Sequence, residues 1–284
     1  PDSSILVFLP GQGEIIRTTD ALTDWLATSK LHGVHLYPLY GNLSIEEQQM
    51  AIAPLLPEQS ARGERKVVIA TNVAETSLTI EGIDVVVDSG LVREPVFDPA
   101  TGMTRLQTGK VSKASSIQRM GRAGRLRPGR CYRLWSASQQ EQLAPHATAE
   151  ILSADLAPLA LQLLQWGVDD PAELSWMDPP PAGPWSQAIE LLTALGAIES
   201  TADNLTLTPH GEAMTALAVH PRLAHLLICA VDVGETELAS LLAAVLSDRD
   251  PFGQENPDIT YPIAILSGEV SCPSKYRGWQ RRTN

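Results

Sequence analysis

The chain has 284 residues, of which 44% are hydrophobic and 19% charged, and this balance is typical of one large or two to three smaller globular domains. No run of about eighteen apolar residues could cross a membrane, and no signal-peptide pattern precedes the first strand-like segment. The formal net charge of −12 argues against a surface that coats nucleic acid indiscriminately.

Strand-like and helix-like patterns alternate from the start of the chain to about residue 136. Apolar runs predict buried strands, and apolar residues at helical spacing predict the helices between them. Strands are expected at 5–9, 34–38, 66–70, 84–88 and 130–135, and helices at 14–29, 45–55 and 114–121. This alternation predicts an α/β domain with a parallel sheet and helices on both of its faces.

Two short runs interrupt the alternation between Arg93 and Thr108. Residues 94–97 and 104–107 flank the turn-forming sequence DPATG at 98–102, which predicts a β-hairpin.

The second half is mostly helical. Helices are expected at 150–166, 185–195, 209–219, 222–233 and 235–246, with a short strand at 205–207 and an irregular tail from Asp248. Helix, helix, strand and helix in that order are compatible with a winged-helix domain.

Three widely spaced cysteines contain no Cys-x-x-Cys pair. This argues against a zinc site or a disulfide framework, so we expect this chain to hold no metal and to work in a reducing cytoplasm.

A basic island lies in the middle of this acidic chain. Residues 62–133 carry 13 basic and 7 acidic side chains, whereas residues 134–284 carry 6 and 19. The island is densest in QRMGRAGRLRPGR at 118–130, which places five arginines in thirteen residues.

If 115–125 forms a helix, Arg119, Arg122 and Arg125 share one side. Arginine presents a planar fork of donors that matches phosphate oxygens. Each interleaved glycine lowers the stability of a helix by about 1 kcal/mol. Glycines at this cost indicate that another group approaches the backbone closely at these positions. A solvated basic helix or a nonspecific nucleic-acid patch is the alternative.

The arginine-rich stretch and three further segments resemble the motifs of DEAH-box superfamily 2 RNA helicases, in the bacterial HrpB-type branch. QRMGRAGRLRPGRCYRLW resembles motif VI, KVVIATNVAETSLTI at 66–80 resembles motif V, and ILVFLPGQGEI at 5–15 resembles motif IV. Residues 34–49 match the segment after motif IV. The resemblance implies a second RecA-like domain at 1–145, a winged-helix domain at 146–215 and the start of a helical ratchet-like domain at 216–284. The hairpin would be the strand-separating β-hairpin of the family, and the alternative is an ordinary extension of the sheet.

The resemblance also implies roles for individual residues at an ATP site between two RecA-like domains. Arg122 and Arg125 would reach the γ-phosphate, and Gln118 would place the attacking water. Arg119 would lie at the ATP site or have a structural role. The remaining ATP contacts would come from Thr79, from Glu81 where the family has Asp at the ribose, and from Ile52 where the family stacks an aromatic ring on adenine.

Contacts to single-stranded RNA would come from Gly11, Thr71, Asn72 and Ser77, which would hold the strand without reading its sequence. The alternative for these hydroxyl residues, taken one by one, is a structural role in a turn or as a helix cap.

The chain has neither the phosphate-binding GxxxxGK[ST] motif nor a DEAH tetrapeptide. The first RecA-like domain of the same parent protein would therefore supply the phosphate loop and the Mg²⁺ ligands. We therefore expect this chain to be the C-terminal part of an ATP-dependent RNA helicase. By itself, it should hydrolyse ATP negligibly. The alternatives are a non-hydrolysing RNA- or protein-binding module and a DNA translocase of the same superfamily.

Overall fold

The computed structural model divides into two compact units, residues 1–98 with 103–149 (unit 1) and residues 99–102 with 150–284 (unit 2). The residues that the structure describes are 4–76, 79–99, 101–123, 128–200, 204–247, 252 and 258–283.

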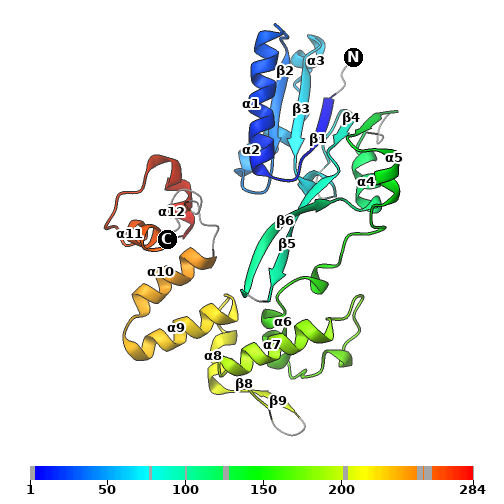
Figure 1. Ribbon diagram of the computed structural model, residues 1–284. Helices are drawn as coiled ribbons and strands as arrows, with labels where there is room; N and C mark the ends of the chain where they lie inside the picture. Colours follow the sequence, from blue (N-terminus) through cyan, green and yellow to red (C-terminus); the bar gives the residue numbers. More distant parts are fainter. Residues whose placement is uncertain are drawn as a thin grey trace. The chain divides into compact units, whose positions relative to one another are not determined.

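Unit 1 is built on a five-stranded sheet with the order β2-β3-β1-β4-β7, in which every neighbouring pair is parallel (Figure 1). Its strands are β1 (Ser4–Phe8), β2 (Val34–Leu39), β3 (Arg65–Ala70), β4 (Ile83–Asp88) and β7 (Arg130–Arg133). The central strands consist of apolar, mostly β-branched residues because both faces of the sheet are covered. This confirms the predicted α/β class.

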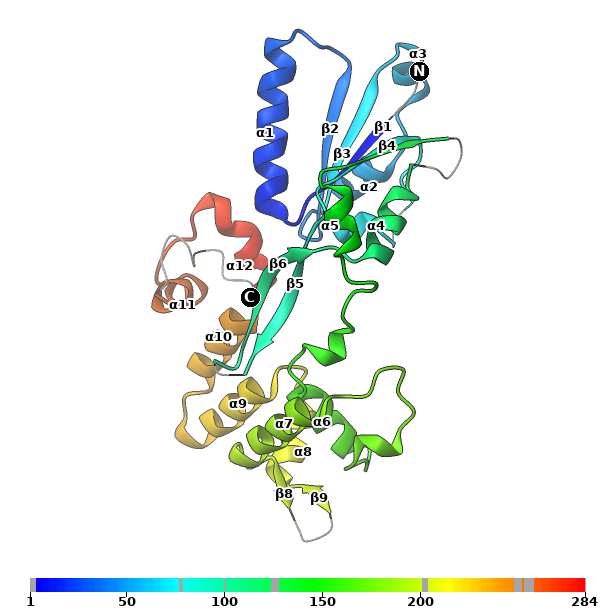
Figure 2. The ribbon, with the colours of Figure 1, turned by 45° about the vertical axis from the view of Figure 1, so that its right-hand side comes forward.

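Helices cover the two faces of this sheet. Helix α1 (Gln12–Thr28) connects β1 to β2 and so runs toward one edge of the sheet. The later connections run toward the other edge: α2 (Ile45–Ile52) and α3 (Pro57–Ala61) connect β2 to β3, and α4 (Lys113–Met120) lies between β4 and β7 in the chain. Since parallel crossovers are right-handed, opposite directions place α1 on one face and α2 and α4 on the other (Figure 2). A short helix that the sequence pattern did not reveal, α5 (Ala137–Glu141), follows β7.

A buried lysine joins β3 to the end of α2. Lys66 is 1% exposed, and its Nζ donates to the carbonyl oxygens of Ala53 and Met50, which the helix leaves unpaired at its C-terminus. Its Nζ lies 5.0 Å from the centre of the Tyr37 ring. Burial disfavours the charged form and lowers the pKa of Lys66 to about 8.

The predicted hairpin is confirmed. Strands β5 (Leu91–Asp98) and β6 (Met103–Lys110) pair antiparallel along their whole length. Gly102 has φ = 65°, a left-handed conformation that glycine adopts without strain, so the turn depends on a glycine there.

Unit 2 is mainly helical and has one two-stranded antiparallel sheet, β8 (Ile198–Ser200) with β9 (Leu205–Leu207). Its longer elements are α6 (Ala157–Gln165), α7 (Ala182–Ala194), α8 (Pro209–Thr215), α9 (Pro221–Val233) and α10 (Thr236–Ser247). Buried Leu161, Leu192 and Met214 belong to one core that joins α6, α7 and α8.

The long helix expected at 150–166 is confirmed in its second part and wrong in its first. A 3₁₀ turn, η2 (Glu150–Leu152), comes first, and α6 begins only at Ala157. Asp155 interrupts the helix because its carboxylate accepts hydrogen bonds from the Ala157 backbone N–H (2.9 Å) and from His220 (2.9 Å). An aspartate that binds the backbone two residues ahead favours a turn over a helix interior.

The irregular tail expected from Asp248 is also wrong in part, because α11 (Thr260–Leu266) and α12 (Arg277–Thr283) lie within it. These helices pack around Phe252, whose ring contacts Tyr261, Tyr276 and Trp279 edge to face at 4.3–5.3 Å between ring centres. Within the part of the chain that the structure describes, no helix is long and apolar enough to span a membrane.

Candidate functional site

The carboxyl ends of the parallel strands bring three of the predicted RNA-contacting residues to one edge of the sheet. Gly11 follows β1 and is the N-cap of α1, whereas Thr71 and Asn72 directly follow β3. Asp88 is the last residue of β4, which lies beside β1. Open α/β sheets bind ligands at this edge. Ser77, the fourth predicted RNA contact, lies outside the described residues.

Gly11 lies under an arginine of the hairpin. A Cβ at Gly11 would lie 2.5 Å from Nη1 of Arg93, so only glycine fits without displacing that side chain. Arg93 Nη2 also donates to Glu14 Oε1 at 3.3 Å. Burial opposes the charged form of Glu14, but its own backbone N–H and the charges of Arg93 and Arg17 hold its pKa below the usual range. This end of the sheet therefore carries fixed charges of both signs.

The segment after β3 begins with a capped 3₁₀ turn. The Thr71 hydroxyl accepts a hydrogen bond from the Val73 backbone N–H at 3.5 Å. This contact agrees with the alternative interpretation of Thr71 as a structural cap. Asn72 is exposed at the start of η1 (Asn72–Ala74). Thr79 and Glu81 are exposed before β4, and Ile52 is half-buried at the end of α2.

Helix α4 includes the first residues of the arginine-rich segment. Ser112 caps α4 by accepting a hydrogen bond from the Ser115 N–H at 3.0 Å, and the helix ends at Met120 with Gly121 as its C-cap. The helix predicted at 114–121 is therefore confirmed, but it ends before Arg122, so the condition for a row of arginines on one side of a helix is not met. Arg122 lies in the turn that follows, and Arg125 lies outside the described residues. Gln118 is exposed on the last turn of α4.

Arg119 is buried in a network of charges, with only 1% of its surface exposed. Its Nε donates to Glu75 Oε2 at 3.0 Å, and its Nη1 donates to Asp88 Oδ1 at 2.9 Å and to the Leu91 carbonyl at 3.1 Å. The guanidinium carbon also lies 4.9 Å from the centre of the Phe8 ring. Arg119 thus holds α4 against η1 and β4, and of the two roles expected for it, this geometry favours the structural one.

Glu75 connects the two arginines of the candidate site. Its carboxylate accepts hydrogen bonds from Arg119 and from the Ser115 hydroxyl, while its backbone carbonyl accepts from Arg122. The Arg122 Nε lies 2.8 Å from that carbonyl oxygen, Nη2 donates to the same oxygen, and the residue is 6% exposed. The guanidinium of Arg122 is therefore turned toward the backbone of motif V.

Sequence reasoning assigned no role to Glu75, Asp88 or Ser115. A signal was available, because a buried arginine needs acidic partners, and both Glu75 and Asp88 follow or end a buried strand. Which carboxylate faces α4 depends on the register of the sheet, which the sequence pattern does not give.

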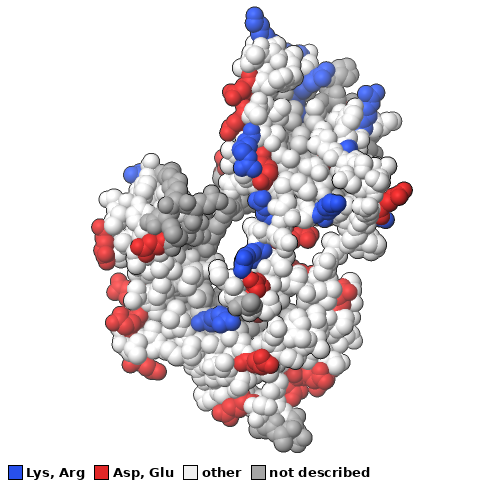
Figure 3. Space-filling view, in the orientation of Figure 1, with Lys and Arg blue, Asp and Glu red and all other residues white. Residues whose placement is uncertain are grey.

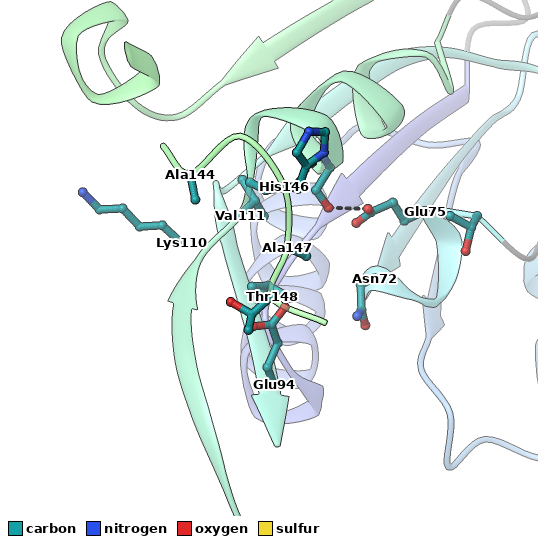
Figure 4. A pocket seen from close by; sticks show the side chains of 13 residues that line it. Asn72, Glu75, Glu94, Lys110, Val111, Ala144, His146, Ala147 and Thr148 are labelled. Atoms are coloured by element: carbon teal, nitrogen blue, oxygen red, sulfur yellow. Dashed lines mark hydrogen bonds between the residues drawn. The ribbon is translucent and has the colours of Figure 1, made fainter. Parts of the chain in front are cut away.

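A pocket of about 250 Å³ opens beside this network, entirely within unit 1 (Figure 4). Glu75 and Asn72 lie on one side of it, and Glu94, Lys110 and Thr148 on the other. The pocket joins motif V, the base of the hairpin and the segment after α5. Its lining mixes polar with apolar side chains and includes charges of both signs, so it offers hydrogen-bonding groups to a polar ligand.

Three comparisons with known proteins agree with these motifs. Residues 1–127 match the family described as helicase conserved C-terminal domain. The ATP-dependent RNA helicase HrpB of Escherichia coli is 45% identical over 258 residues, which cover 91% of this chain and 30% of that protein. A crystal structure of E. coli DExH-box NTPase HrpB aligns over the whole of this chain with a TM-score of 0.79 and 43% identity. The chain belongs to the DEAH-box helicase family, in its HrpB-type branch.

A eukaryotic relative shares the same helicase region. The Schizosaccharomyces pombe pre-mRNA-splicing factor ATP-dependent RNA helicase prp22 is 40% identical over 249 residues, which cover 86% of this chain and 20% of that protein. This HrpB-type chain spans less than a third of the length of both curated relatives. The structural alignment also identifies the sheet of unit 1 as RecA-like.

Proposed function

We propose that this chain is the C-terminal part of an ATP-dependent RNA helicase that couples ATP hydrolysis, at the interface of two RecA-like domains, to movement along single-stranded RNA. The observation that carries the proposal is the contact between motif VI and motif V. Arg119 and Arg122 both bind Glu75, directly beside the residues predicted to hold RNA. A displacement of either motif is therefore transmitted to the other.

On the nucleotide side, Arg122 and Arg125 would stabilise charge on the transferring γ-phosphoryl group, and Gln118 would orient the attacking water. Thr79, Glu81 and Ile52 would surround the nucleoside. The first RecA-like domain of the longer protein would supply the phosphate loop and the Mg²⁺ ligands. Arg122 would then have to exchange the Glu75 carbonyl for phosphate oxygens, which are stronger acceptors for a guanidinium.

On the RNA side, Gly11, Thr71, Asn72 and Ser77 would hold the phosphate backbone, and the β5–β6 hairpin would separate strands. Residues 146–215 would form the winged-helix domain and residues 216–284 the start of the ratchet-like domain. The three cysteines of the chain are free, which supports a reducing compartment and hence the cytoplasm.

One observation favours the alternative of a non-hydrolysing binding module. The Arg122 guanidinium already has an acceptor inside unit 1, in the Glu75 carbonyl. In a module that only binds RNA or a protein, this contact would be permanent, and Arg122 would never meet a phosphate.

Steady-state ATP hydrolysis with and without RNA distinguishes these functions. The 284-residue chain by itself should hydrolyse ATP negligibly, whereas the longer protein should hydrolyse it and be stimulated by single-stranded RNA. No hydrolysis by the longer protein, with or without RNA, would refute the helicase proposal and favour the binding module. Stimulation by single-stranded DNA, with none by RNA, would favour the DNA translocase.

A further inference from the structure

Three side chains with metal-binding atoms meet in unit 2, which contains no residue of the candidate helicase site. His210 lies in α8, and His225 and Cys229 lie in α9. The ligand atoms of all three lie within 4.8 Å of one another. His210 Nε2 is 2.9 Å from His225 Nδ1, and Cys229 Sγ is 3.8 Å from the same Nδ1.

The fold holds these residues together for reasons that do not involve a ligand. His225 and Cys229 are four residues apart in α9, so they lie one turn apart on the same face of the helix. Met214 of α8 and Ala224 of α9 are buried in one core, which fixes the two helices against each other. Two rigid helices therefore present the three ligands, as is favourable for a site that must keep its geometry.

Two of the three separations between ligand atoms are close to those of a tetrahedral zinc site. With Zn–N bonds of about 2.0–2.1 Å and a Zn–S bond of about 2.3 Å, tetrahedral angles separate two nitrogens by about 3.3 Å and a nitrogen from a sulfur by about 3.6 Å. The observed separations of 2.9 and 3.8 Å differ from these values by a few tenths of an ångström. Small rotations of the side chains would suffice, and neutral imidazole with thiolate is a donor set that suits zinc.

We propose that His210, His225 and Cys229 bind one Zn²⁺ ion, with the fourth position open to solvent. Cys229 is exposed, so the ion has a path to the site. Residues 134–284 carry 6 basic and 19 acidic side chains, and Figure 3 shows acidic side chains spread over the visible face of unit 2, so the local field attracts cations. The ion would join α8 to α9 and stabilise the folded state of unit 2.

This proposal departs from the expectation that the chain holds no metal, which arose because the spacing His-x₁₄-His-x₃-Cys contains no close cysteine pair. Only the packing of α8 on α9 brings His210 to the other two ligands. The zinc site does not depend on the proposed helicase function, since none of its residues belongs to a helicase motif. Without a metal, the same geometry would be a hydrogen-bonded histidine pair next to a thiol.

Metal titration of the purified 284-residue chain tests the site. After treatment with a chelator, the chain should bind one equivalent of Zn²⁺ with a dissociation constant of about 1 µM or less, measured against a chromophoric competitor. Cobalt(II) in its place should give the near-ultraviolet charge-transfer band of a thiolate ligand and the visible bands of tetrahedral coordination. Zinc should also raise the midpoint of thermal unfolding, because it binds only the folded state.

Variants assign the ligands. Cys229→Ser should remove the charge-transfer band and weaken zinc binding about 100-fold, and His210→Ala should weaken it similarly. Cys272→Ser changes a cysteine outside the cluster and should leave both properties unchanged. Thermal unfolding in chelator shows whether each variant folds, and Cys229→Ser is expected to fold because Cys229 is exposed. Zinc binding weaker than about 1 µM in the unsubstituted chain, or unchanged in Cys229→Ser, would overturn the proposal.

Discussion

Replacing Arg119 by methionine should destabilise unit 1 severely, and an arginine in the hairpin offers a matched control. Both Arg119 and Arg105 form an ion pair with an aspartate at nearly the same distance, 2.9 Å to Asp88 and 2.7 Å to Asp98. They differ in burial: the Arg119 and Asp88 side chains are 1% and 0% exposed, and those of Arg105 and Asp98 are 65% and 35% exposed. The comparison contrasts a buried arginine that has several partners with an exposed arginine in a single ion pair.

The expected cost follows from the groups that Arg119 would leave behind. Asp88 would remain as a fully buried carboxylate, and its Oδ2 already has no hydrogen-bond partner among the described residues. Glu75, whose side chain is 13% exposed, would also lose its main positive partner. Removing one partner of a buried ion pair costs about 3–5 kcal/mol, because the other charge stays buried and uncompensated. The exposed pair of Arg105 should be worth about 0–1 kcal/mol.

Urea unfolding followed by far-ultraviolet circular dichroism measures both costs in the transition that reports unit 1. Arg119→Met should shift that transition to much lower urea, whereas Arg105→Met should leave it almost unchanged. Arg119→Lys should recover only part of the loss, since one ammonium group cannot replace a fork that contacts Glu75, Asp88 and the Leu91 carbonyl together. Equal stability of the two methionine variants would refute the assignment of Arg119 as a buried connection between the motifs.

Further predictions concern stability in both units. Because burial lowers the pKa of Lys66 to about 8, the stability of the wild type relative to Lys66→Met should be constant below pH 8. It should rise between pH 8 and 10.5, where the unfolded chain binds a proton that the folded chain has released; urea unfolding across this range measures it. Gly129→Ala should cost about 3 kcal/mol or more because its Cβ would collide with backbone carbonyl groups, whereas Gly109→Ala meets open space and should unfold at nearly the same urea concentration as the wild type. Burial opposes the charged form of Asp155, but the hydrogen bond from His220 holds its pKa below 3.8. The advantage of the wild type over Asp155→Asn should therefore be complete at neutral pH and disappear in acid unfolding as the pH falls below 3.8.

The sequence predicted the sheet and the hairpin well because their signals are local. The apolar runs of β3 and β4 fit only buried strands, and the DPATG turn between β5 and β6 leaves little choice of register. Periodicity failed at 150–166, since α6 and the turn before it bury their apolar residues in the same core and so preserve a helical pattern across the break. The break itself comes from Asp155, whose partner His220 lies 65 residues away.

Local sequence patterns could not predict the tail helices or the contacts of the arginines. Helices as short as α11 and α12 are marginal in isolation and depend on the aromatic packing around Phe252. Arg119 and Arg122 occupy the predicted segment, but the direction of each side chain is set by Glu75, which comes from another part of the chain. Motif resemblance identified these arginines without indicating which of them lies in the core.

Our central proposal is that Arg122 contributes its guanidinium to an ATP pocket that another domain completes. The most direct test of this proposal is to measure RNA-stimulated ATP hydrolysis by the longer protein. Removing an arginine that stabilises the transferring phosphoryl group lowers the rate by about 10³–10⁵-fold. Arg122→Ala should show a loss of this size, whereas Arg130→Ala, an exposed arginine of the same cluster, should retain most of the activity. RNA-stimulated hydrolysis at the wild-type rate in Arg122→Ala would contradict the account.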